Sequence, residues 1–299
     1  MPDGITPLPR AFAERLRAGR FVMTAEVAPP VSCDAQDLLR KAVPLRGLAD
    51  AVNMTDGAGA RAHMAALAAS AILIDVGIEP ILQLTCRDRN RLALQGDLLA
   101  AHALGVPNVM AVAGEEITHG DHHEAKAVYD INLLELIAAI GTLGAGRDMA
   151  GVDLKGAPQF LVGSTVKVPA GSEGLKAELA DLDKKIAAGA RFFTTQPVFD
   201  VAVLENFRQQ VGKRPAAIIP TVLLLKSVGM ARYINRHLEM KIPEEYINRI
   251  QKAADRVREC VQIAAEFAAA IKEKGFPGVL IATIGWEDKL PSILGAAGF

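Results

Sequence analysis

Short runs of apolar and β-branched residues alternate with longer segments of helical spacing along almost the whole chain. The runs predict eight strands, at residues 21–28, 51–55, 80–85, 108–113, 160–166, 192–197, 217–223 and 279–284. Runs of this length are typical of strands rather than of helices. The regular alternation of strands with helical segments indicates an α/β protein.

Three of the segments between the predicted strands have a clear helical repeat. Apolar residues recur at every third or fourth position within residues 64–74, 175–186 and 254–271. Gly77 and Gly189 follow the first two segments and are expected to end these helices. The third segment ends in KEKG, which places cations in the last turn and a glycine cap behind them.

Eight strands that alternate with helices within 299 residues predict a (β/α)8 TIM barrel. We expect it to span residues 1–299 as a single catalytic domain. A doubly wound open sheet has the same local pattern and stays as the structural alternative. Two observations weigh against it: no GxGxxG motif follows the first predicted strand, and no linker divides the chain near its midpoint.

Two segments depart from the alternation. Residues 226–252 form a helical region with scattered polar positions, and residues 114–130 form a loop rich in His, Asp and Glu. Because the loops after barrel strands carry function, we expect ligand contacts in the second segment. His122 and His123 are adjacent there, and neighbouring side chains rarely point at one centre. The loop is therefore predicted to be a polar segment that covers a ligand, and no metal site is expected.

Composition narrows the class of protein. Hydrophobic residues make up 51% of the chain and aromatic residues 5%, so Ala, Leu, Ile and Val are expected to build the core. A net charge of −1 argues against nucleic-acid binding, because phosphate contacts need a basic surplus. No apolar run reaches the roughly 18 residues of a membrane-spanning helix, and the N-terminus does not resemble a signal peptide.

The three cysteines, Cys33, Cys86 and Cys260, are widely separated and form no CxxC pair. They are interpreted as reduced thiols of a cytoplasmic protein, because neither a disulfide framework nor a zinc site has this spacing. Cys260 lies in an apolar helical stripe and is expected to be buried.

Polar residues stand at the carboxyl ends of the predicted strands, where a barrel places its active site. In chain order they are Glu26, Thr55, Gln83, Thr85, Glu115, Thr165 and Gln196. Because the ends of parallel strands surround one mouth of a barrel, we expect these side chains to converge there.

Glu26 is unusual among these residues, because it lies in the apolar segment VMTAEVAPP. A carboxylate in such surroundings is costly to bury unless it is paired or protonated. One interpretation is a general acid whose pKa is raised by its apolar setting. The other is a carboxylate at the rim that reaches water, and the residue pattern leaves both open.

Gln196 lies in FFTTQPVFD, at the end of the sixth predicted strand. Its amide can donate and accept hydrogen bonds, which suits a heterocyclic ligand with mixed hydrogen-bonding edges. The alternative is that this amide holds the neighbouring loop. Asp200, four residues later, is predicted to be the N-cap of the next helix.

Seven segments resemble methylenetetrahydrofolate reductases in sequence, order and spacing. They are AEVAPP (25–30), VNMTDGA (52–58), QLTCRDRNR (83–91), GDHHEAKAVYD (120–130), AGARFFTTQPVFD (188–200), VLLLKSVGMARYIN (222–235) and IGWEDKLPSIL (284–294). The resemblance extends over residues 21–299. It is greatest to short family members of acetogen-like one-carbon pathways, which lack a regulatory domain.

This resemblance implies a barrel that reduces 5,10-methylenetetrahydrofolate to 5-methyltetrahydrofolate with NAD(P)H as the electron donor. Glu26 matches the family's acid, which is proposed to help protonate the imidazolidine ring of the substrate. Gln196 matches a folate-contacting glutamine, and Glu115 stands in place of an aspartate near both folate and flavin. The resemblance also implies a bound flavin, which we expect to be FAD; FMN or no flavin are the alternatives.

Further positions match the family's cofactor site. These are Thr55, Gln83, Gly114, Thr165, Glu178 and Lys185. Glu178 and Lys185 match positions on the fifth helix that hold the ribose and phosphate of the cofactor, a use that suits the point charge of a lysine. A solvated helix face is the alternative for both.

Four positions depart from the family pattern, and three of them touch the cofactor. Ala113 replaces an arginine, Gln83 a histidine, Thr165 an aromatic residue and Met230 a second folate-binding glutamine. Two alternatives therefore stay open: direct hydride transfer from NADH to folate without flavin, and a non-redox folate-binding subunit. We also expect a homo-oligomer, with a partner subunit as a further possibility.

Overall fold

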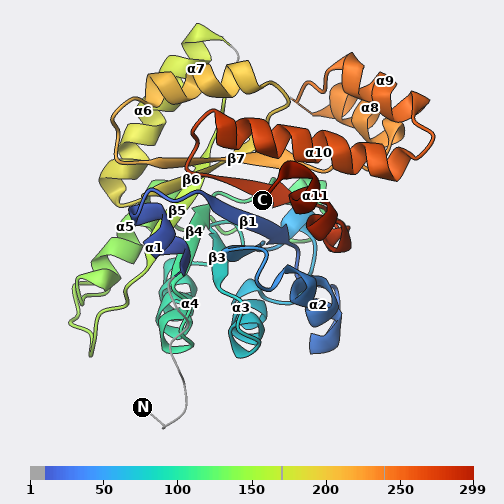
Figure 1. Cartoon of the computed structure of the whole chain (residues 1–299). Coiled ribbons are helices and arrows are strands. Elements are labelled where there is room, and N and C mark those ends of the chain that lie inside the picture. Colours follow the sequence, from blue (N-terminus) through green and yellow to red (C-terminus); the bar gives the residue numbers. More distant parts are fainter. Residues whose placement is uncertain (1–10, 170, 239) are drawn as a thin grey trace.

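The computed structural model describes residues 11–169, 171–238 and 240–299. Eight parallel strands follow one another in sequence order around a closed barrel, with helices packed outside (Figure 1). The barrel closes because β1 pairs with both β2 and β8. The predicted (β/α)8 barrel is therefore confirmed, and the open doubly wound sheet is excluded.

The strands lie close to their predicted positions. They are β1 (Val22–Val27), β2 (Ala51–Met54), β3 (Pro80–Thr85), β4 (Asn108–Val112), β5 (Leu161–Val166), β6 (Phe192–Pro197), β7 (Ala217–Leu223) and β8 (Gly278–Ala282). The α-helices are α1 (Ala11–Arg17), α2 (Ala35–Ala42), α3 (Ala66–Asp75), α4 (Arg91–Ala103), α5 (Leu133–Gly144), α6 (Ser172–Ala188), α7 (Val201–Val211), α8 (Val228–His237), α9 (Glu244–Lys252), α10 (Arg256–Glu273) and α11 (Leu290–Ala297). Short 3-10 turns occur at η1 (Val43–Leu45), η2 (Ala58–Ala60), η3 (Ile117–His119) and η4 (Glu287–Lys289).

The helix signals in the sequence also hold. Gly189 ends α6, and Asp200 caps α7 by accepting hydrogen bonds from the backbone N–H groups of Ala202 and Val203. The helical region 226–252 consists of two helices, α8 and α9, which project together to one side of the barrel (Figure 1). Cys260 is fully buried in α10, as predicted, and all three cysteines are free thiols.

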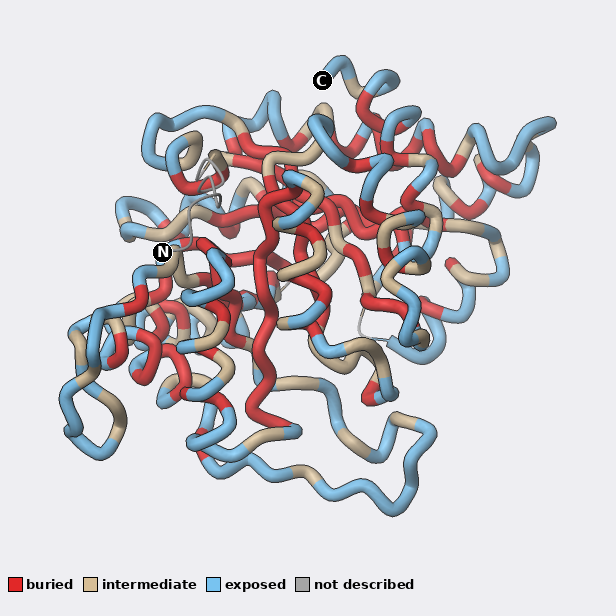
Figure 2. The backbone as a smooth tube through the Cα atoms, turned by 90° about the horizontal axis from the view of Figure 1, so that it is seen from below, coloured by how far each residue is buried: buried red, intermediate tan, exposed pale blue. Residues whose placement is uncertain are grey.

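Alternate residues of each strand face the barrel interior and the surrounding helices. Outward-facing Ala25 and Val27 of β1 belong to the large core between strands and helices, whereas inward-facing Val22 belongs to a smaller core inside the barrel. The buried segments therefore run through the centre of the molecule, and the exposed ones form its periphery (Figure 2).

The amino-terminal end of the barrel is filled by side chains. Phe12 of α1 meets Phe192 of β6 edge to face, with 5.3 Å between ring centroids. The buried Glu79 carboxylate holds α1 in place by accepting hydrogen bonds from the backbone N–H groups of Ala11 (2.7 Å) and Phe12 (3.4 Å). Gly163 leaves room for the Phe192 ring, since a Cβ at that position would lie 2.2 Å from it.

No helix in the part of the chain that the structure describes is both long enough and apolar enough to cross a membrane.

Candidate functional site

A cavity of about 610 Å³ lies at the carboxyl ends of the strands. Four residues expected at the mouth line it together: Glu26, Gln83, Thr165 and Gln196. Threonines and apolar side chains of the strands form much of the remaining inner wall, and α8 contributes apolar residues to the outer wall. This volume is in the usual range for a small-molecule site.

Glu26 is half-buried near the end of β1, in register with Asn53 of β2 and Ala282 of β8. Burial raises the pKa of Glu26 from 4.5 to about 7, because the ionised carboxylate loses hydration there. The negative charge of Glu115 raises this pKa further, whereas the Asn53 amide lowers it. Glu26 can therefore hold a proton near neutral pH and release it to a weakly basic atom in the cavity.

Asn53 is a polar residue of this site that the sequence analysis missed. It is 1% exposed, and its amide lies near enough to Glu26 to lower the pKa of that carboxyl group. Residues in register on neighbouring strands point to the same face, so Asn53 faces the barrel interior beside Glu26. Its position two residues before Thr55 was the available signal, because strand alternation places both on one face.

Gln196 lines the cavity but uses its amide for the neighbouring loop. The amide oxygen accepts a hydrogen bond from the Val168 N–H at 3.0 Å, and the amide nitrogen donates to the Val168 carbonyl at 3.4 Å. Of the two interpretations of Gln196, the structure therefore shows the one in which its amide holds the neighbouring loop. A ligand that hydrogen-bonds to this amide must share it with the loop after β5 or displace that loop.

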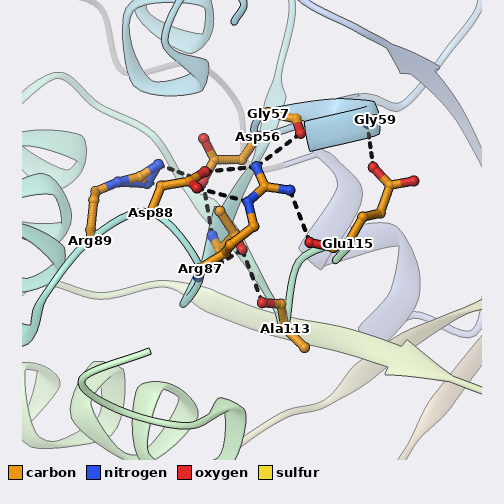
Figure 3. Close-up of polar contacts among 9 residues, drawn as sticks. Asp56, Gly57, Gly59, Arg87, Asp88, Arg89, Ala113 and Glu115 are labelled. Carbon is orange, nitrogen blue, oxygen red and sulfur yellow. Dashed lines mark hydrogen bonds and ion pairs between the residues drawn. The ribbon is translucent and has the colours of Figure 1, made fainter. Parts of the chain in front are cut away.

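Arg87, just after β3, connects three loops of the mouth (Figure 3). Its guanidinium donates to the carbonyl oxygens of Gly57 (3.0 Å) and Glu115 (3.2 Å), and it pairs with Asp88 at 2.7 Å. The Arg87 carbonyl accepts a hydrogen bond from Val128, at the far end of the loop 114–130. The Arg87 side chain is almost fully buried, so this buried cation holds the loops after β2, β3 and β4 together.

Two glycines make room for this arrangement. Gly57 has a φ of +62°, and a Cβ there would lie 2.5 Å from the Arg87 guanidinium. Gly114 has a φ of +91°, and a Cβ there would lie 2.2 Å from the Thr85 hydroxyl. Beside them, the Glu115 carboxylate accepts a hydrogen bond from the Gly59 N–H (Figure 3). These contacts fix the charge of Glu115 at the mouth.

We expect Arg87→Met to lower the free energy of unfolding by about 2–4 kcal/mol, because two backbone carbonyls lose a charged donor. Urea denaturation of both proteins measures this change. The matched control is Arg91→Met, which removes an exposed pair with Asp130 and should change stability by less than about 1 kcal/mol. Equal effects of the two substitutions would contradict the role assigned to Arg87.

A sequence model of methylenetetrahydrofolate reductase matches residues 11–298. The chain belongs to the methylenetetrahydrofolate reductase family. Methylenetetrahydrofolate reductase 2 of Schizosaccharomyces pombe is 25% identical to it over 182 residues, which are 59% of this chain and 28% of the yeast protein. The chain thus spans well under half the length of that relative.

Solved structures share the barrel at low sequence identity. An uncharacterized protein from Clostridium thermocellum that binds two copies of 5-methyl-5,6,7,8-tetrahydrofolic acid superposes with a TM-score of 0.65 and 15% identity, covering 96% of this chain and 98% of that protein. A 2,3-dimethylmalate lyase of the PEP mutase/isocitrate lyase superfamily gives a TM-score of 0.53 and 15% identity, covering 97% and 87%. At these identities the likeness shows the fold alone.

The ring system of the flavin expected in this reductase family finds suitable partners in the structure. Gln83 and Thr165 line the cavity and offer polar side chains to it. An amide and a hydroxyl can both hydrogen-bond to the polar edge of a ring. Thr55, Thr85, Gly114 and Glu115 do not line the cavity. Gly114 instead makes room for Thr85 and Arg87.

The two residues of α6 expected at the phosphate and ribose of the cofactor hydrogen-bond within the protein. Lys185 is 5% exposed, donates to the Thr165 carbonyl at 2.9 Å and pairs with Asp181 at 2.6 Å. Glu178 accepts a hydrogen bond from the Lys167 N–H at 2.8 Å. Both side chains therefore hold the barrel end and the loop after β5, and their role at a cofactor stays a prediction.

Among the residues that the structure describes, no three His, Cys, Asp or Glu side chains gather into a group that could hold a metal ion.

Proposed function

We propose that this protein reduces 5,10-methylenetetrahydrofolate to 5-methyltetrahydrofolate with electrons from NAD(P)H. One observation supports this proposal most directly: Glu26, an acid with a pKa of about 7, lies in the wall of a cavity large enough for a ligand. The chain also belongs to this reductase family. The solved barrel with bound 5-methyltetrahydrofolic acid supports a folate as the ligand.

The proposed chemistry needs one proton and one hydride. Glu26 gives its proton to one ring nitrogen of the imidazolidine. The bond between the methylene carbon and this protonated nitrogen breaks, and the lone pair of the other ring nitrogen forms an iminium with the methylene carbon. The iminium carbon then accepts hydride and becomes the methyl group. The apolar cavity favours this sequence, because it keeps Glu26 protonated near neutral pH until an amine is present.

The origin of the hydride distinguishes two candidates. Bound FAD, proposed from family membership, would accept electrons from NAD(P)H and deliver hydride to the folate. The second candidate is direct hydride transfer from NADH to the folate, because Ala113, Gln83 and Thr165 depart from the family's cofactor contacts. A non-redox folate-binding subunit would bind the same ligand without turnover.

The absorption spectrum of the purified protein, followed by an NAD(P)H-dependent folate assay, tests these proposals. Flavin bands with turnover would support FAD, and a colourless active protein would support direct transfer. If added FAD restores colour and raises activity, FAD binds weakly. If the protein binds the folate but does not reduce it with either NADH or NADPH, the reductase proposal is overturned.

We expect the rate of folate reduction to fall as pH rises through about 7, because Glu26 loses its proton in this range. Glu115→Gln removes a negative charge that disfavours ionised Glu26, so its midpoint should lie at lower pH. Rate profiles over pH for wild type and variant measure the two midpoints. Glu116→Gln, at the exposed neighbouring residue, is the control, and identical midpoints for wild type and Glu115→Gln would refute this electrostatic coupling.

A further inference from the structure

β6 and β7 do not pair residue for residue along their whole length. Pairing with β6 is regular up to Ile219 of β7 and resumes at Thr221 after a shift of register. Between these two positions β7 has one residue, Pro220, whereas β6 has two, Thr195 and Gln196. One extra residue in one of two paired strands is a β-bulge, a feature that is frequent next to active sites. The bulge therefore includes Gln196, the glutamine of the cavity wall.

Pro220 explains why the bulge lies at this position. Proline has no backbone N–H and cannot donate a hydrogen bond to a neighbouring strand, so prolines in sheets occur at edge strands, at the first residue of a strand or at bulges. Pro220 is buried in the middle of β7, which pairs with β6 on one side and β8 on the other. Because the closed barrel has no edge strand, a bulge in β6 opposite Pro220 is the arrangement that accommodates it.

Two threonine side chains replace the regular hydrogen bonds between the strands at the bulge. The Thr195 hydroxyl accepts a hydrogen bond from the Thr221 N–H at 3.1 Å, and the Thr221 hydroxyl donates to the Thr195 carbonyl at 2.6 Å. The Thr195 hydroxyl also donates to the Gln196 carbonyl at 2.6 Å. Both threonines are buried, so loss of either hydroxyl would leave buried backbone groups without a partner. These three contacts therefore fix the backbone of the bulge.

The bulge changes which side chains of β6 face the cavity of Glu26. In a regular strand, only alternate residues face the same side of the sheet. Here four consecutive residues, 194–197, line the cavity. Gln196 is held within this run at two points, because its carbonyl accepts from Thr195 and its amide exchanges hydrogen bonds with the backbone of Val168. The position of the Gln196 amide therefore depends on the bulge.

We propose that Thr195 and Thr221 are positioning residues, which hold the bulge of β6 and thereby place the Gln196 amide where it can contact a bound folate. This inference rests on the proposed function, because it needs a folate in the cavity. The hydroxyls of both threonines hydrogen-bond within the bulge, so the two residues act through Gln196. Glu26 lies on β1, which pairs with β2 and β8, so its proton transfer does not depend on the bulge.

Steady-state kinetics of Thr195→Val and Thr221→Val test this proposal, because valine keeps the shape of threonine but removes the hydroxyl. Each substitution should raise the KM for 5,10-methylenetetrahydrofolate at least about fivefold, since a displaced Gln196 amide loses its contact with the folate. The kcat should change by less than about threefold, and the pH midpoint of the rate should stay at the wild-type value. Thr195→Ser keeps the hydroxyl and should return the KM to within about twofold of the wild type.

Ser164→Ala is the matched control for these variants. The Ser164 hydroxyl is buried in β5 and donates to the Ala111 carbonyl of β4 at 2.9 Å, and Ser164 does not line the cavity. This substitution also removes a buried hydrogen bond between neighbouring strands, so it should lower stability about as much as Thr195→Val but leave the folate KM unchanged. Equal KM changes in Ser164→Ala and Thr195→Val would show that the threonine only stabilises the barrel, and would overturn the positioning role.

Hydrogen exchange at the Val168 N–H gives a measurement that needs no folate. This N–H donates to the Gln196 amide oxygen at 3.0 Å, so displacement of Gln196 in Thr195→Val should speed its exchange at least about tenfold, whereas Ser164→Ala should not change it. An unchanged folate KM or an unchanged exchange rate in Thr195→Val would each overturn the positioning role. If the wild type neither binds nor reduces a folate, the proposed function is overturned, and the exchange rate alone then decides whether the bulge positions Gln196.

Discussion

Glu26→Gln is expected to slow reduction of the folate by at least about 100-fold, the usual scale for loss of a positioned acid. Glutamine keeps the shape and hydrogen-bonding capacity of the side chain but removes the transferable proton. If the protein carries a flavin, its reduction by NAD(P)H needs no acid at this position and should change by less than about tenfold. Stopped-flow measurement of each half-reaction, or folate turnover alone in a colourless protein, gives the result.

Stability measurements distinguish loss of the acid from disruption of the fold. Because the pKa of Glu26 is raised from 4.5 to about 7, the folded state binds this proton more tightly than the unfolded state. The free energy of unfolding that this residue contributes is therefore lost as pH rises from about 4.5 through 7, by at most about 3 kcal/mol. In Glu26→Gln, which has no titratable group at this position, this part of the pH dependence should be absent. Equal folate rates in the two proteins would show that Glu26 is only a rim carboxylate.

Gly163→Ala is expected to lower the free energy of unfolding by about 3 kcal/mol or more, because the new methyl group overlaps a packed ring. A Cβ at Gly163 would lie 2.2 to 2.5 Å from three atoms of the Phe192 ring. That ring is fully buried against Phe12 and cannot move without displacing α1 from the end of the barrel. Urea denaturation of wild type and variant measures the loss.

Gly96→Ala is the matched control for this substitution. Gly96 lies within α4, and a Cβ there meets nothing within 4 Å. Alanine should stabilise the protein by about 0.5–1 kcal/mol, because glycine costs conformational entropy inside a helix. If both substitutions shift the unfolding midpoint in the same direction and by the same amount, contact with the Phe192 ring does not restrict the size of the side chain at position 163.

The barrel could be predicted from the sequence because strand length and helical spacing repeat regularly, and the closed order follows from that repetition. The convergence of Glu26, Gln83, Thr165 and Gln196 could also be predicted, because parallel strands end at one mouth. The role of Glu26 in catalysis stays a prediction. Its elevated pKa depends on burial and on Glu115, which the strand pattern alone does not determine.

Other parts of the site depend on geometry that the sequence pattern does not contain. Lys185 and Glu178 lie on the predicted helix, but helical spacing could not show that they hydrogen-bond to the Thr165 carbonyl and the Lys167 N–H. The contacts of Arg87 depend on loop backbones with positive φ at Gly57 and Gly114. Spacing along the chain could not show that three separate loops meet at one guanidinium.

The contacts of Arg87 have a consequence for how this mouth can evolve. The guanidinium holds Gly57 and Glu115 through their backbone carbonyls, and Val128 is held through its backbone N–H. Every residue type offers a carbonyl, so the side chain at position 115 can change without loss of this frame. The two glycines have no such freedom, because a Cβ at either would strike Arg87 or Thr85. The fold should therefore tolerate substitution of side chains that point into the mouth but not of the two glycines behind it. Substrate chemistry can then diverge while the backbone of the mouth stays the same.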